Sequence, residues 1–109
     1  GLGAFDACAH GKPVIMTGYG GQLDYLARKH AYLVDYELVP VSDPAARASY
    51  SPDQNWAEPS VPHAAALMLR AFDDPASASQ RGRRLREHVL DRFAEAAVTK
   101  GFVDALRRL

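Results

Sequence analysis

The feature that most constrains the fold is a short helical segment that leads directly into a buried strand and then a glycine-rich loop. Residues 1–11 favour a helix of about two turns that ends at Gly11. The apolar Val-Ile-Met run at 14–16 is typical of a strand in a parallel sheet. Three glycines within residues 17–21 let the backbone turn sharply and let another group approach it closely. This pattern predicts an α/β fold that binds ligands at the carboxyl end of the strand.

The remaining chain is expected to continue the sheet briefly and to end in helices. Residues 22–28 favour a short helix and residues 31–34 a second strand. Residues 36–41 could continue that strand or pair beside it, with Pro40 restricting the later part to a sheet edge. The sequence is interpreted as one domain, 1–109, divided into a βα core part (1–41), a long surface loop (42–62) and helices (63–109).

Three amphipathic helices are predicted after the loop. Ser60 is suited to cap the first helix, with Pro62 in its first turn and Pro75 ending it. The second is expected over about 77–93 and the third over about 94–109. Apolar residues expected to face the core are, in chain order, Ala64, Leu67, Met68, Ala71, Phe72, Leu85, Val89, Leu90, Phe93, Val98, Phe102, Leu106 and Leu109.

Composition fits an ordinary globular chain. The 109 residues are 48% hydrophobic and 24% charged, with a formal net charge of zero, so the overall balance does not call for nucleic acid. The lone Cys8 cannot form an internal disulfide, and no run approaches the ~18 apolar residues of a membrane span. A cytoplasmic location is the expectation.

The charges are unevenly distributed. Residues 1–75 carry five basic and nine acidic groups, whereas residues 76–109 carry eight basic and four acidic groups. Solvated helix faces account for this excess, and docking on anionic lipid or on a partner protein is the alternative. The arginines concerned are Arg81, Arg83, Arg84, Arg86 and Arg92.

Several common sites do not fit the residues. The dinucleotide motif G-x-G-x-x-G would need glycine where Leu23 stands. A P-loop does not fit either, because the only lysine near a glycine in this region, Lys12, leads into proline. Cys8 and His10 are too closely spaced for a usual zinc pair, so no metal site is predicted. The four histidines have no neighbouring acid or nucleophile in sequence that would indicate catalysis.

Two segments retain a possible binding role. The amides of Gly1 to Gly3, with Asp6 in the first helical turn, could hold a phosphate, or they could form a plain helix start. In the long loop, Tyr36, Tyr50 and Trp56 could stack on a sugar or base, or they could anchor the loop to the sheet.

The motif from Gly1 to Gly21 resembles the signature of the large retaining GT-B glycosyltransferase family. Its residues read G-L-x-x-x-D-A-C-A-H-G-K-P-V-I, followed by Thr17 and a Gly-Gly turn at Gly20 and Gly21. In that family two acids separated by seven residues flank the glycine turn. Asp6 matches the second acid, usually Glu, and the first would lie three residues before Gly1.

The resemblance implies a fold, an activity and a set of binding residues. The fold would be a partial Rossmann-like domain, the C-terminal half of GT-B, with a short parallel sheet and C-terminal helices. The intact enzyme would transfer a hexose with retention from a nucleotide-diphospho-sugar, using no metal or other cofactor, and this chain alone would be inactive. Asp6 would hold the donor ribose, while the amides of Gly1, Leu2 and Gly3 would approach its sugar and diphosphate.

Further expectations concern the glycine loop and the partners. Tyr19, Gly20 and Gly21 form a possible ligand loop. The N-terminal acceptor domain of the parent enzyme would be the main partner. The alternative interpretation is a non-catalytic Rossmann-like module that self-associates through exposed sheet edges and apolar helix stripes.

Overall fold

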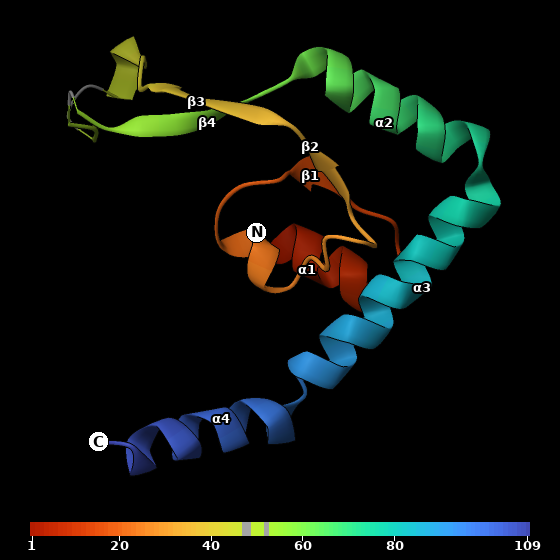
Figure 1. Cartoon of the computed structure of the whole chain (residues 1–109), viewed down its shortest axis with the longest axis vertical. Coiled ribbons are helices and arrows are strands. Elements are labelled where there is room, and N and C mark those ends of the chain that lie inside the picture. Colours follow the sequence, from red (N-terminus) through yellow and green to blue (C-terminus); the bar gives the residue numbers. More distant parts are fainter. Residues whose placement is uncertain (47–48, 52) are drawn as a thin grey trace.

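The computed structural model describes residues 1–46, 49–51 and 53–109, and this described part is a mixed α/β structure (Figure 1). It contains a parallel pair of strands, an antiparallel pair, and four α-helices. The elements follow in the order α1 (Leu2–Ala9), β1 (Ile15–Thr17), η1 (Gly21–Asp24), β2 (Tyr32–Val34), β3 (Tyr36–Pro40), η2 (Pro44–Ala46), β4 (Asn55–Pro59), α2 (Val61–Asp73), α3 (Pro75–Arg92) and α4 (Glu95–Arg107).

The parallel pair β1–β2 forms the centre of the molecule and confirms the two strands expected from the apolar runs. Ile15 pairs with Tyr32 and Thr17 with Val34. Backbone bonds extend the ladder at both ends, because Tyr32 N donates to the Val14 carbonyl at 2.9 Å and Gly18 N to the Val34 carbonyl at 3.0 Å. All three residues of β1 are half-buried, not fully buried as a strand covered on both faces would be.

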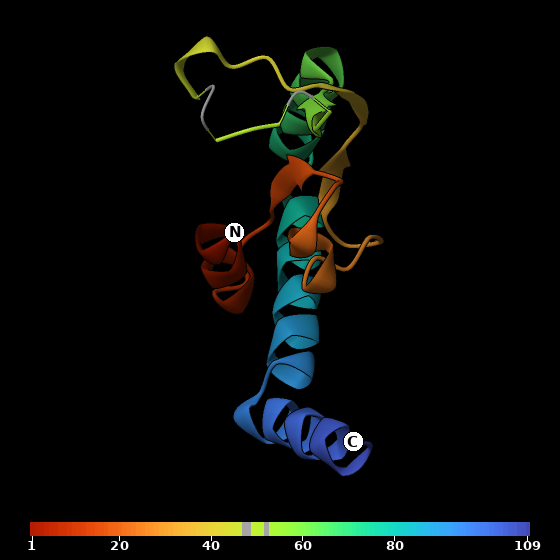
Figure 2. The same ribbon diagram turned by 90° about the vertical axis from the view of Figure 1, so that its left-hand side faces the viewer.

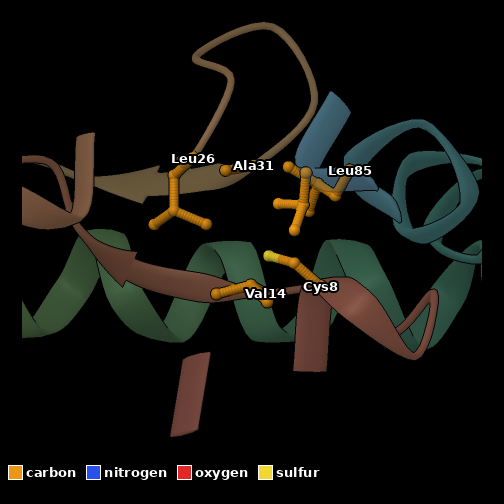
Figure 3. Packing of buried hydrophobic residues seen from close by; sticks show 6 residues of the cluster. Cys8, Val14, Leu26, Ala31 and Leu85 are labelled. Carbon is orange, nitrogen blue, oxygen red and sulfur yellow. The ribbon is translucent and has the colours of Figure 1, made fainter. Parts of the chain in front are cut away.

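Helices lie on both faces of this strand pair. Tyr32 and Val34 pack with Leu67 of α2 on one face, and Ile15 joins them. The other face packs against α1 and α3 in a core cluster shown in Figure 3. The alternation of side chains along a strand explains this division of neighbouring residues between two faces.

The larger cluster joins four parts of the chain around Cys8. It consists of the buried residues Cys8, Val14, Leu26, Ala31, Leu85 and Val89 (Figure 3). Leu85 and Cys8 are completely buried. Burial raises the pKa of the Cys8 thiol above its ordinary value, so the side chain behaves as a small neutral apolar group.

The segment 42–62, expected to be a loop, contains a strand. β4 pairs with β3 in antiparallel register, with Tyr36 opposite Pro59 and Pro40 opposite Asn55. Residues 36–40 therefore neither continue β2 nor join its sheet, but form one strand of a hairpin that projects beyond β2 (Figure 1). Prolines at the ends of both strands are compatible with a ladder because they lie at its two limits.

The helix boundaries follow local capping chemistry. Ser60 caps α2 as expected, since its Oγ accepts a hydrogen bond from His63 N at 3.2 Å. Asp74 caps α3 by accepting from Ser77 N at 3.0 Å. Pro75 begins α3, where its missing N–H costs nothing, and α2 ends two residues earlier.

Much of the predicted helical core is exposed to solvent. On α2, Leu67 is buried, but Met68 is 60% and Phe72 82% exposed. None of the residues of α4 is buried, and the apolar stripe expected there is exposed at Val98, Phe102 and Leu106. On α3 the stripe is buried at Leu85 and Val89 but exposed at Leu90 and half-buried at Phe93.

The arrangement of the helices is open. α2, α3 and α4 follow one another along the side of the molecule, and α4 turns away at the bottom of α3 (Figures 1 and 2). The radius of gyration is 17.0 Å. A compact domain of this length is expected to reach about 13 Å. Among the described residues, no helix combines the length and apolarity required to cross a bilayer.

Candidate functional site

One predicted binding segment is the exposed start of α1. Gly1 is the N-cap residue and makes no side-chain cap, and Gly1, Leu2 and Gly3 are all exposed. Helix geometry leaves the first amides of α1 without intrahelical acceptors, while Phe5 N donates to the Gly1 carbonyl at 3.1 Å. The helix start therefore presents N–H groups to solvent and can accept an anionic group.

Asp6 lies one turn further along α1 than the sequence suggested. Because the helix begins at Leu2, its first turn contains no acidic residue, and the expectation of a first-turn acid is wrong. The residue is exposed, and its carbonyl oxygen lies 2.8 Å from Nδ1 of His10. An exposed carboxylate at this position can accept hydrogen bonds from ligand hydroxyl groups.

The possible ligand loop is the glycine loop at the carboxyl end of β1. Gly20 has φ +93°, a conformation that L side chains rarely adopt, which explains the need for glycine there. Gln22 Nε2 donates to the Thr17 carbonyl at 3.0 Å, and Leu23 N donates to the Gly20 carbonyl at 3.1 Å. These bonds hold the loop in place while Tyr19, Gly20 and Gly21 stay exposed.

Tyr25 joins the start of α1 to the short helix that follows the glycine loop. It directly follows η1, and its hydroxyl donates to the Gly1 carbonyl at 2.8 Å. The start of α1 and the short helix after the glycine loop consequently lie beside each other (Figures 1 and 2). Burial, and secondly the nearby Cys8 thiol when ionised, raises the pKa of Tyr25, so its hydroxyl stays protonated and able to donate.

Phe5 packs against Tyr25 and stabilises this contact. Its ring makes an edge-to-face contact with Tyr25 at a centroid distance of 5.4 Å, and a second one with Phe93 at 5.6 Å. The start of α1, the end of η1 and the end of α3 are thereby packed together. Sequence reasoning missed Tyr25, because nothing in the local pattern indicates a bond to a residue 24 positions earlier.

The aromatic residues of the 36–60 segment pack on one another. Tyr36 lies 5.0 Å from Tyr19 of the glycine loop, and Tyr50 lies 6.2 Å from Trp56 of β4, both measured between ring centroids. These pairs support the anchoring alternative over a stacking platform. The Tyr19–Tyr36 contact ties the glycine loop to the base of the hairpin.

The histidines and α3 arginines occupy separate local environments. His63 Nδ1 accepts from Asp35 N at 2.9 Å, which fastens α2 to the end of β2. Arg86 Nε donates to the Ala9 carbonyl at 3.1 Å, while Arg81 reaches carbonyl groups of the loop before β2. Arg81 and Arg86 thus bind carbonyl groups of two different segments. Within the described ranges, no three His, Cys, Asp or Glu residues are grouped to hold a metal ion.

Comparisons of this chain with protein-family models, with curated proteins and with solved structures found no match. The resemblance to GT-B glycosyltransferases therefore depends on the residues of the motif between Gly1 and Gly21.

Proposed function

We propose that this chain forms part of the donor-binding domain of a retaining GT-B glycosyltransferase. The intact enzyme would transfer a sugar from a nucleotide-diphospho-sugar to an acceptor. The observation that carries the proposal is the hydrogen bond from Tyr25 to the Gly1 carbonyl at 2.8 Å. It brings the start of α1, which the motif assigns to the donor, beside the short helix that follows the possible ligand loop.

The parallel strand pair with helices on both faces supports the same proposal. In α/β sheets, ligands bind outside the carboxyl ends of parallel strands, and the glycine loop directly follows the carboxyl end of β1. The positive end of α1 lies beside it through the Tyr25 bond. A diphosphate held there would be stabilised by amide N–H groups with no metal ion involved.

Each binding residue has a definite role in this proposal. The amides of Leu2 and Gly3 bind the diphosphate, and Asp6 accepts hydrogen bonds from the ribose hydroxyls. Tyr25 is a positioning residue that fixes the Gly1 carbonyl and hence the direction of the helix start. Catalysis in the whole enzyme would come from donor positioning and from stabilisation of the leaving diphosphate.

The test is calorimetric titration of the chain with UDP, GDP and the corresponding monophosphates. A longer chain that also carries an acid three residues before Gly1 is titrated in parallel. We expect a diphosphate to bind more tightly than its monophosphate, because the second phosphate gains the helix amides. Asp6→Asn is expected to weaken binding about tenfold through loss of charged hydrogen bonds.

Asp91→Asn is the matched control, since Asp91 is also exposed but lies on α3. Its affinity should equal that of the unsubstituted chain. Tyr25→Phe is a second variant, which tests the positioning role of Tyr25 because it removes only the hydroxyl that donates to the Gly1 carbonyl. If neither chain binds any diphosphate or nucleotide-sugar while folded, the glycosyltransferase proposal is wrong.

A further inference from the structure

A basic depression lies between α3 and the loop that precedes β2, and it shares no residue with the proposed donor site. It has a volume of about 260 Å³. Its lining residues are Lys29, His30, Ser77, Gln80, Arg81 and Arg84. All six are polar and no acid is among them, although the chain as a whole is neutral.

Arg81 is the fixed cation of the basic depression. Its Nη1 donates to the carbonyl groups of Lys29 at 3.3 Å and His30 at 3.4 Å. Its guanidinium carbon lies 4.7 Å above the ring of Tyr32, a cation–π contact that further restricts it. A guanidinium has five N–H donors, so these bonds leave others for a ligand while holding the group in place.

A neighbouring depression shows where the positive charge is concentrated. It shares Lys29, His30 and Arg84 with the first but is also lined by Glu87 and Asp91. There Arg84 is paired with Glu87 at 3.4 Å. Acids thus border the cations on the side toward the end of α3. The side toward Ser77 is lined by Lys29, Arg81 and Arg84 and by no acid, although Arg84 itself is paired with Glu87.

The pKa of His30 is affected by these cations. Burial lowers its pKa, and the charges of Lys29, Arg84, Arg81 and His88 lower it further. Burial first, and then the cations of the loop and of α3, therefore favour the neutral imidazole. A bound anion would offset these charges and allow the ring to become a further charged donor.

We propose that the basic depression binds the phosphate group of a small phosphorylated molecule. Arg81 and Arg84 donate to its oxygens, Lys29 supplies a third charge, and Ser77 and Gln80 offer neutral hydrogen bonds. Arginine suits this role because its planar fork matches the oxygens of a phosphate group. Lysine adds a mobile point charge.

The test is an NMR titration of the full chain with inorganic phosphate and with glycerol 3-phosphate. Chloride balances the ionic strength throughout. We expect saturable shifts of the Lys29 and Ser77 amides and of the His30 imidazole, and a rise in the pKa of His30 when phosphate is present. The tighter of the two probes identifies the ligand as free phosphate or as a phosphomonoester.

Arg84→Gln is expected to raise the dissociation constant about tenfold. Arg83→Gln is the matched control, because Arg83 is an exposed neighbour on α3 that does not line the basic depression. Lys29→Gln provides a second variant on a different element. Shifts that do not saturate, or equal losses in Arg83→Gln and Arg84→Gln, would overturn the proposal by showing only general charge attraction.

Discussion

The α-carbon of Gly82 lies directly against the backbone of Gly11. A Cβ atom at position 82 would overlap the carbonyl group of Gly11 and the carbonyl carbon of Lys12. Gly11 itself has φ +69° and follows His10, the C-cap residue of α1. Two glycines far apart in sequence therefore allow α3 to cross the end of α1 at backbone contact.

This contact predicts a large effect of Gly82→Ala. The added methyl group meets backbone atoms that cannot rotate away, so the free energy of unfolding should fall by about 2–4 kcal/mol. Gly101→Ala is the control, because the Cβ there meets nothing within 4 Å. That change should raise the helix stability by about 0.5–1 kcal/mol. Urea unfolding followed by circular dichroism measures both, and equal effects would contradict the close packing.

Two leucines of α3 should respond differently to truncation. Leu85 is completely buried beside Cys8, whereas Leu90 is 48% exposed. Leu85→Ala should lower the free energy of unfolding by about 3–4 kcal/mol, since it leaves a cavity in the larger core cluster. Leu90→Ala should cost less than about 1 kcal/mol. Similar losses in urea unfolding would show that the core lies elsewhere.

The cap of α2 gives a third prediction. Ser60→Ala removes the Oγ that accepts from His63 N, and the free energy of unfolding should fall by about 1 kcal/mol. Ser79→Ala, an exposed serine within α3, is the control and should change stability by less than about 0.5 kcal/mol. A smaller loss for Ser60→Ala than for Ser79→Ala would exclude the cap.

The lowered pKa of His30 predicts a definite pH dependence. Folding favours the neutral ring, so its contribution to stability is complete above the ordinary value of 6.5. It is lost as the pH falls below 6.5 toward the lower pKa of the folded state. The chain should therefore lose more stability than His30→Gln between about pH 7.5 and pH 5.5. Arg84→Gln should raise the pKa of His30, measured by NMR of the imidazole, because it removes one of the charges that lower it. An unchanged or lower pKa would contradict this contribution of Arg84.

The central strands and the cap of α2 could be predicted from sequence because local patterns determine them. The apolar run before Thr17 and the cap at Ser60 depend on neighbouring residues only. β4 was missed because Asn55 to Pro59 lies among prolines and lacks a buried face. Its pairing with β3 is a long-range contact that periodicity does not register.

The helical stripes show a different limit. Periodicity identifies Met68 and Phe72 as part of an apolar face of α2, and Phe102 as part of one on α4. It cannot say whether such a face is covered, and all three side chains are exposed. For the candidate site, the two glycine segments could be found from their residues. Their meeting through Tyr25 could not, since the bond joins residues 24 positions apart.

The exposure of α4 has a consequence for the time course of amide hydrogen exchange. A helix of 13 residues with no buried side chain has little beyond its own backbone bonds to keep it formed. Its amides should exchange by local fraying within seconds to minutes, while those of α3 around Leu85 exchange only when the whole core opens. The chain would then behave as two cooperative units, with the boundary near Phe93, where α3 ends against Phe5.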